Sequence, residues 1–221
     1  MAKKKLIHFQ ENLTFPHLFQ PAYNDLITGF PHRGHWHENF FNNDHPIVAE
    51  LGCGKGEYTV GLAEKYPQGN FIGIDWKGAR LWKGSKAVSV QGLRNAGFVR
   101  IMVDHVELIF ASSEVSEIWI TFPDPQVHKE RLRLTSPGFL DKYRNILIPG
   151  GIIHLKTDDN FFYNYTLDVI REHNHTLLLH TDDLYNSGID HDVTSIQTYY
   201  ESRWLSMGKK ICYVRFQLNK K

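Results

Sequence analysis

The sequence has few cysteines, almost no net charge and no long apolar run. Its 221 residues include two cysteines, Cys53 and Cys212, so a disulfide framework is excluded and a reducing, cytoplasmic environment is expected. No segment approaches the roughly 18–20 apolar residues that a membrane span needs, so no membrane partner is expected. The formal net charge is +1, so a nucleic-acid partner would have to be recognised by a local basic patch.

What the sequence does contain is an alternation of strand-like and helix-like segments that begins near residue 46. Short apolar runs predict strands at residues 47–51, 70–75, 98–104, 116–122, 152–157, 176–180 and 210–218. Helical segments are predicted between them, at residues 57–66, 78–95, 137–147 and 160–173. This alternation is typical of an α/β fold with a doubly wound, mostly parallel, seven-stranded sheet.

Residues 1–45 show no clear periodicity and carry aromatic side chains between turn formers. We expect them to form an irregular, partly helical N-terminal arm, which either packs onto the main domain or stays mobile until a substrate binds. Residues 46–221 then form one domain, a size that suits a single α/β core.

Acidic residues stand at or near the ends of five predicted strands, at Glu50, Asp75, Asp104, Asp124 and Asp158. Right-handed crossovers bring the carboxyl ends of parallel strands to one edge of the sheet, and ligands bind at that edge. The sequence therefore predicts an acid-lined cleft there.

A glycine-rich turn follows the first predicted strand, at residues 52–56 (Gly-Cys-Gly-Lys-Gly). Its glycines permit a tight turn and a close approach of a ligand to the backbone. The dinucleotide fingerprint needs a further glycine where Glu57 stands, and a carboxylate at that helix start repels a pyrophosphate but tolerates a sulfonium. The turn therefore favours S-adenosylmethionine, with Asp75 accepting hydrogen bonds from the ribose and Asp104 reaching the adenine amino group or the cofactor tail.

Two prolines flank one carboxylate in the segment Pro123-Asp124-Pro125. Because proline fixes φ, this arrangement suits an acid that is held rigidly beside a reacting group. A proline-stiffened turn without a chemical role is the alternative.

A basic run follows at residues 128–133, in which Lys129, Arg131 and Arg133 are cationic, and Lys142 and Arg144 stand on the next predicted helix. Side chains of this kind position RNA through its phosphates rather than by reading its sequence. A solvated charged loop is the alternative, but the place of the run beside the ligand-binding edge favours RNA.

The segment Thr198-Tyr199-Tyr200-Glu201 has two interpretations. The two rings and the carboxylate could grip a splayed base, by stacking on it and by accepting its N–H groups. Alternatively, Thr198 begins a helix and Glu201, three residues on, completes a capping box. The two interpretations are compatible.

A group of histidines and the cysteine of the glycine turn do not predict a metal site or a catalytic nucleophile. His32, His35, His37 and His45 lack a neighbouring cysteine and fit no regular ligand face, so no metal is expected. Cys53 is interpreted as a small residue in a tight turn, and no nucleophile is paired with a base, so covalent catalysis is not expected.

Together these motifs resemble those of the bacterial tRNA (guanine-N7)-methyltransferase family, of the TrmB type. The resemblance covers about residues 46–215. The glycine turn marks methyltransferases broadly, whereas the Pro-Asp-Pro, Lys-Thr-Asp and Thr-x-Tyr-Glu pieces, in this order, are far more specific. The matching pieces of this chain are residues 50–56, 70–75, 122–125, 131–135, 155–159 and 198–201.

The resemblance implies a Rossmann-like class I methyltransferase domain that moves a methyl group from S-adenosyl-L-methionine to N7 of a guanine in the variable loop of tRNA. It implies that Asp124 is the catalytic acid. The implied cofactor-binding residues are Glu50, Gly52, Gly54, Asp75, Asp104 and Asp124. The implied substrate-binding residues are His128, Asp158, Thr198, Tyr199, Tyr200 and Glu201. Both a monomer and a homodimer remain open.

The chain departs from the family pattern at three positions, with Gln126 where tryptophan is usual, His128 in place of lysine and Asp75 in place of glutamate. An amino-methyltransferase acting on adenine or a small molecule is the nearest alternative, although such enzymes commonly end the Pro-Asp-Pro region with an aromatic residue. A non-catalytic RNA-binding module is the alternative of a different class. The intact glycine turn and the acids near the strand ends argue against it.

Overall fold

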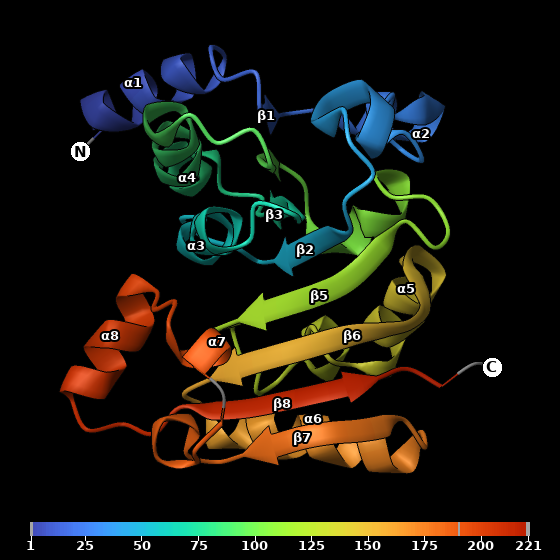
Figure 1. Ribbon diagram of the computed structural model, residues 1–221, viewed down its shortest axis with the longest axis vertical. Helices are drawn as coiled ribbons and strands as arrows, with labels where there is room; N and C mark the ends of the chain where they lie inside the picture. Colours follow the sequence, from blue (N-terminus) through green and yellow to red (C-terminus); the bar gives the residue numbers. More distant parts are fainter. Residues whose placement is uncertain (1, 190, 220–221) are drawn as a thin grey trace.

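Eight strands form one sheet at the centre of the structure (Figure 1). The computed structural model describes residues 2–189 and 191–219. The strand order is β1-β4-β3-β2-β5-β6-β8-β7, and neighbouring strands are parallel except where β8 pairs with β6 and β7. The strands are β1 (Leu18–Phe19), β2 (Ile47–Leu51), β3 (Asn70–Ile74), β4 (Ala96–Val99), β5 (Val115–Thr121), β6 (Leu147–Thr157), β7 (Thr176–Thr181) and β8 (Cys212–Gln217).

The predicted α/β fold with a mostly parallel sheet is confirmed, but the sheet has eight strands rather than seven. The extra strand is β1, in which Leu18 and Phe19 of the N-terminal arm pair with β4. The arm is also more regular than the sequence predicts. It contains α1 (Ala2–Asn12), α2 (Tyr23–Gly29) and a π-helical turn, η1 (His37–Phe41).

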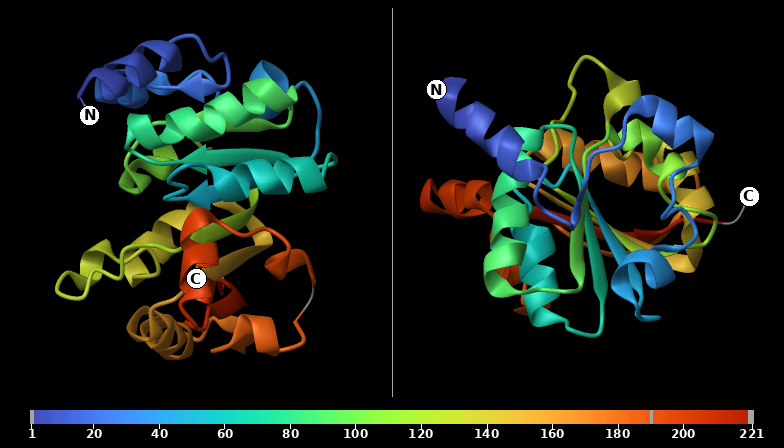
Figure 2. Two further views of the ribbon diagram at one scale, coloured as in Figure 1. Left: turned by 90° about the vertical axis from the view of Figure 1, so that its left-hand side faces the viewer. Right: turned by 90° about the horizontal axis from the view of Figure 1, so that it is seen from above.

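Helices cover both faces of the sheet, as the views in Figures 1 and 2 show together. The apolar sides of α3 and α4 pack in one core cluster, and those of α5 and α6 pack in another. The helices that follow the arm are α3 (Glu57–Lys65), α4 (Gly78–Gln91), α5 (Pro137–Ile146), α6 (Asn160–Glu172), α7 (His191–Thr194) and α8 (Tyr199–Ser206), with 3-10 turns at η2 (Val103–Leu108), η3 (Glu130–Leu132) and η4 (Leu184–Asn186).

Two elements are shorter than the sequence predicts. α4 ends at Gln91 rather than at residue 95, because Gly92 takes φ 66 and caps the helix in the left-handed region. The strand predicted over residues 98–104 ends at Val99, where the pairing of β4 with β3 also ends. Asp104 therefore lies in η2 and not at a strand end, which corrects the predicted row of strand-end acids.

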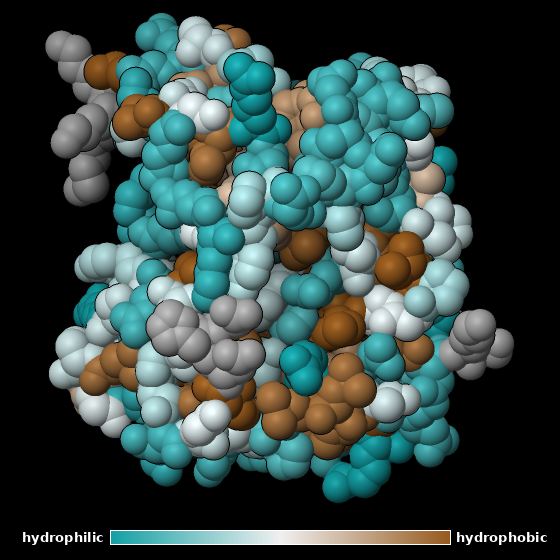
Figure 3. Space-filling view, viewed as in Figure 1, coloured by the Kyte–Doolittle hydropathy of each residue, from teal (hydrophilic) through white to brown (hydrophobic). Residues whose placement is uncertain are grey.

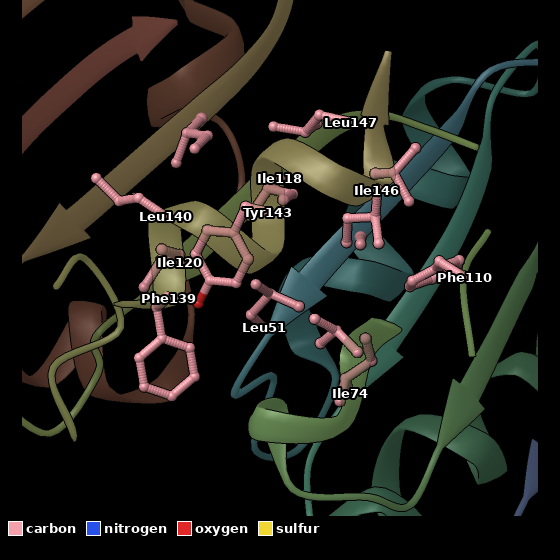
Figure 4. Packing of buried hydrophobic residues seen from close by; sticks show 14 of the residues in the cluster. Leu51, Ile74, Phe110, Ile118, Ile120, Phe139, Leu140, Tyr143, Ile146 and Leu147 are labelled. Atoms are coloured by element: carbon pink, nitrogen blue, oxygen red, sulfur yellow. The ribbon is translucent and has the colours of Figure 1, made fainter. Parts of the chain in front are cut away.

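The larger core cluster lies against α5 and α6 and includes part of the arm. Figure 4 shows the Tyr143 ring of α5 directed toward Leu51 of β2 within this cluster. Trp36 of the arm is fully buried in the same cluster. We therefore propose that the described part of the arm, residues 2–45, folds together with the domain that follows it.

The face that carries α3 and α7 is less completely covered by helices. In Figure 3, hydrophobic surface gathers where β7 and β8 lie in Figure 1, and Leu177 and Leu178 of β7 are partly exposed. A cavity of about 610 Å³ lies on the same face, between α3 and the strands β5, β6 and β8. None of the helices within the described ranges is long and apolar enough to span a membrane.

Candidate active site

The glycine turn at residues 52–56 follows β2 and is packed closely at Gly56 but not at Gly54. Gly52, Gly54 and Gly56 adopt φ of 75, 58 and 70, a backbone region that favours glycine. A Cβ on Gly56 would lie 2.4 Å from a ring carbon of Phe98, whereas a Cβ on Gly54 would meet nothing nearer than 4.0 Å. The turn is therefore locked into the core at Gly56, and it leaves room at Gly54 for a ligand to approach the backbone.

Asp75, the residue after β3, supports this turn. Its Oδ2 accepts the backbone N–H of Gly54 at 3.0 Å, and its Oδ1 accepts that of Lys77 at 2.7 Å. Each carboxylate oxygen has two lone pairs, so both oxygens can accept a further hydrogen bond. Asp75 can thus hold the turn and also accept a ribose hydroxyl, and this cofactor contact stays a prediction.

Glu50 lies behind the turn and is almost fully buried. Its Oε2 accepts the backbone N–H and the hydroxyl of Thr59, at 2.8 and 2.5 Å, and its Oε1 accepts the hydroxyl of Thr121 at 2.6 Å. Burial raises the pKa of Glu50 to about 7, against the opposing effect of these hydrogen bonds. Glu50 therefore braces β2 against α3 and β5, and its direct contact with a cofactor stays a prediction.

The raised pKa of Glu50 predicts that this residue makes the fold less stable as the pH rises. In the folded protein the Glu50 carboxyl keeps its proton up to about pH 7, whereas in the unfolded chain it loses the proton near pH 4.5. The contribution of this proton to the free energy of unfolding is therefore complete below pH 4.5, and it is lost as the pH rises to 7. From pH 5 to 7.5 the wild type should lose about 2 kcal/mol more unfolding free energy than Glu50→Gln. Urea unfolding of both proteins at the two pH values measures this difference, and parallel pH trends would contradict the assignment.

Asp124 lies in an exposed loop after β5, the strand next to β2. Its Oδ1 accepts the backbone N–H of Gln126 at 3.1 Å. Phe122 and Gln126, on either side, have φ of 50 and 47, which non-glycine residues rarely adopt. Such backbone strain concentrates at functional sites, because the surrounding structure must hold it in place. The carboxylate is thus exposed and its backbone is fixed, as the Pro-Asp-Pro pattern predicts.

The capping box predicted at α8 is confirmed. Glu201 donates its backbone N–H to the hydroxyl of Thr198 at 3.2 Å, and the Thr198 N–H is accepted by the Glu201 carboxylate at 3.3 Å. The start of α8 is docked on the start of α3, because the N–H of Tyr199 donates to Glu57 at 2.8 Å. Lys55 of the turn lies 4.3 Å from the centre of the Tyr199 ring, and the rings of Tyr199 and Tyr200 stay about half exposed. Two aromatic faces therefore stand beside the turn.

The Glu201 carboxylate does not face this exposed surface. The side chain is fully buried, with Lys156 Nζ of β6 2.6 Å from Oε1, and the Tyr185 hydroxyl donates to the same oxygen at 2.9 Å. Burial lowers the pKa of Lys156, and the charge of Glu201 opposes that shift. The prediction that Glu201 accepts the N–H groups of a base is therefore wrong, because no solvent-facing surface remains for a base to meet.

The basic patch is smaller than predicted. Arg133 is 6% exposed, its guanidinium stacks on Phe161 and Tyr165, and it donates to a backbone carbonyl, so it is not a free phosphate contact. Lys142 donates to the Asp104 carbonyl at 2.6 Å, and Arg144 to the carbonyl of Asn219. The exposed members are His128, Lys129 and Arg131, which line a hollow of about 560 Å³ at the start of α5.

Two features named in the sequence analysis remain, Asp158 and the histidines of the N-terminal arm. Asp158, just after β6, pairs with Lys209 at 2.8 Å and keeps part of its surface exposed. His37 is engaged with the carbonyl of His45 at 2.9 Å. Within the described ranges, no three side chains of histidine, cysteine, aspartate or glutamate are grouped to hold a metal.

Comparison of the sequence with known proteins shows which family this chain belongs to. A family described as "Putative methyltransferase" matches residues 44–214. The tRNA (guanine-N(7)-)-methyltransferase of Christiangramia forsetii is 50% identical over 221 residues, 98% of this chain and 99% of that protein. The protein of that name from Bacteroides thetaiotaomicron is 47% identical over 219 residues, 99% of this chain and 87% of that protein. This chain belongs to the tRNA (guanine-N(7)-)-methyltransferase family.

Solved structures of other methyltransferases share the fold of this chain. The 16S rRNA methyltransferase KamB superimposes with a TM-score of 0.62 at 15% identity, covering 79% of this chain and 88% of that one. A structure described as an antibiotic-related methyltransferase gives 0.60 at 18% identity, covering 81% and 90%. These identities are low, so the likeness concerns the fold alone.

Sequence reasoning missed two contributors to the site of this methyltransferase. Lys156 is a charged residue inside the apolar run of β6, and this mismatch is a signal that it has a buried partner. Lys55, in the glycine turn, gave no such signal, because its contact with Tyr199 joins residues far apart in the sequence.

Proposed function

We propose that this chain transfers a methyl group from S-adenosyl-L-methionine to N7 of a guanine in the variable loop of tRNA. The observation that carries the proposal is the meeting, at one edge of the sheet, of an open glycine turn, a rigid exposed acid and two exposed tyrosines. The 50% identity to an enzyme named for this reaction supports it. We infer a cytoplasmic location, where the buried thiols of Cys53 and Cys212 stay reduced.

The residues fit the methyl donor in two respects. Space is open beside Gly54, where the donor can approach the backbone, and Asp75 beside it retains capacity to accept ribose hydroxyls. The cofactor supplies a sulfonium methyl group. The carboxylate of Glu57 at the start of α3 disfavours a phosphate at that helix N-terminus, which argues against a nucleotide cofactor.

The chemistry requires positioning and electrostatics rather than a base. Guanine N7 has an in-plane lone pair and no proton, so it attacks the methyl carbon in line. The carbon–nitrogen bond forms as the sulfur–carbon bond breaks, and positive charge passes from sulfur to the purine. The Asp124 carboxylate stabilises this charge and accepts the N1–H and N2–H groups of guanine, which adenine does not carry at these positions.

The substrate side is assigned to groups exposed at the same edge. Tyr199 and Tyr200 offer ring faces on which a base can stack, and Asp158 and His128 stand within the surrounding loops. Lys129 and the neighbouring Arg131 position the RNA backbone through its phosphates.

The proposed function is tested by incubating the protein with unmodified tRNA and isotopically labelled S-adenosylmethionine, followed by nucleoside mass spectrometry. We expect label in 7-methylguanosine, mapped to the variable loop by nuclease digestion. Label in a methyladenosine would support an amino-methyltransferase, and binding of RNA without any transfer would support a non-catalytic module.

Replacement of Lys129 and Arg131 by alanine should weaken tRNA binding and flatten its salt dependence. Each lost phosphate contact lowers the slope of log affinity against log salt by roughly 0.7–0.9. Arg133→Ala is the matched control, because this buried arginine stacks on Phe161 and Tyr165. It should lower the unfolding midpoint and leave the salt slope unchanged. Filter binding across a salt series measures the slopes, and equal slopes for all variants would remove the basic loop from the RNA interface.

A further inference from the structure

A buried lysine ties the connection between α7 and α8 to the end of β6. The Lys156 side chain is fully buried. Its Nζ donates to the carbonyl of Val193 at 2.9 Å and to that of Ile196 at 3.4 Å, and it lies 2.6 Å from the Glu201 carboxylate. One ammonium group therefore holds three points of a single segment, residues 193–201.

The same segment has little freedom on its other sides. The Glu201 carboxylate also accepts the Tyr185 hydroxyl at 2.9 Å and the backbone N–H of Thr198 at 3.3 Å. Ile196 packs so closely on α3 that a Cβ added to Gly61 would lie 2.7 Å from its Cγ2. The segment is thus fixed by directed hydrogen bonds and by packing on α3.

This segment carries two exposed tyrosines, Tyr199 and Tyr200. Both lie within the held segment, where the Tyr199 N–H donates to Glu57 at the start of α3 and Lys55 of the glycine turn lies over both rings. A buried ion pair contributes little net stability compared with apolar side chains of similar volume, because both charges must lose their hydration. Its directed bonds, by contrast, fix one orientation of the segment.

We propose that Lys156 and Glu201 form a latch that positions Tyr199 and Tyr200 for tRNA, without touching tRNA or cofactor themselves. The proposal rests on the proposed function for the identity of the substrate. It assigns Glu201 a positioning role in place of the base contact that the sequence predicts. It also explains why the Lys-Thr-Asp and Thr-x-Tyr-Glu pieces occur in the same chain, since one supplies the lysine and the other the carboxylate.

The test compares Lys156→Met, the double variant Lys156→Met/Glu201→Leu and a matched control, Glu117→Leu. The double variant leaves no unpaired charge, so it should recover most of the thermal stability that Lys156→Met loses. Glu117 lies 3.2 Å from His154 Nε2 across β5 and β6, and it accepts the indole N–H of Trp119. The control therefore perturbs a neighbouring pair without releasing the latch.

We expect the double variant to raise the KM for tRNA at least tenfold, with kcat at saturating tRNA within threefold of wild type. Glu117→Leu should lower the unfolding midpoint and leave KM within twofold. A folded double variant with the wild-type KM, or an equal rise in KM for Glu117→Leu, would overturn the latch.

Hydrogen exchange without RNA separates this proposal from the proposed function. The α8 amides should exchange at least tenfold faster in the double variant, while those of β6 and β8 keep their protection. If the wild type methylates no tRNA, the proposed function fails but faster exchange in α8 still supports the latch. Unchanged exchange in α8 overturns the latch whatever the substrate is.

Discussion

Asp124→Asn is expected to lower the rate of methyl transfer at saturating tRNA and cofactor by about 10²-fold or more, with the fold intact. The removal of one preorganised electrostatic group facing developing charge typically costs this much. The amide oxygen of asparagine can still accept the N–H of Gln126, so the loop keeps its hydrogen bond and only the charge is lost. Single-turnover rates with labelled cofactor measure the effect.

The matched control is Asp44→Asn, which removes an exposed carboxylate just before β2, at the opposite edge of the sheet. Its rate should stay within twofold of the wild type. A rate for Asp124→Asn close to that of the control would remove the carboxylate from the mechanism. Increased methylation of adenine by Asp124→Asn would instead support the second role, the selection of guanine through its N–H edge.

Features that depend on local backbone chemistry could be predicted from the sequence. The glycine turn requires left-handed φ angles that few other residues tolerate, and the box between Thr198 and Glu201 needs only residues three apart. The run of parallel strands follows from short apolar segments separated by helices. Each glycine, capping residue and apolar segment is recognised from its immediate neighbours in the sequence.

Features that depend on a distant partner could not be predicted in the same way. Arg133 is buried because α6 presents Phe161 and Tyr165 to it, and Glu201 is buried because β6 presents Lys156. Asp104 lies off the strand because the pairing of β4 with β3 ends at Val99. In each case the side chain type is compatible with a surface role, and only the tertiary neighbour decides against it.

Gly54→Ala is expected to weaken cofactor binding at least tenfold while the protein stays folded. Its φ of 58 makes any Cβ unfavourable, at a cost of about 1–2 kcal/mol of stability. The added methyl would project into open space, which is the space that we assign to the cofactor. Calorimetric titration with S-adenosylmethionine measures the affinity, and urea unfolding measures the stability.

Two other glycines separate the loss of stability from the loss of cofactor. Gly92, at the end of α4, has φ 66 and nothing within 4 Å of its added Cβ, so Gly92→Ala should show the same cost with unchanged affinity. Gly56→Ala adds a clash with Phe98 at 2.4 Å, so it should lose a further 1–3 kcal/mol or so. Equal cofactor affinities for Gly54→Ala and Gly92→Ala would mean that the cofactor does not approach this turn. In that case the open side at Gly54 would need another occupant, and Asp75 beside it would serve only to hold the turn.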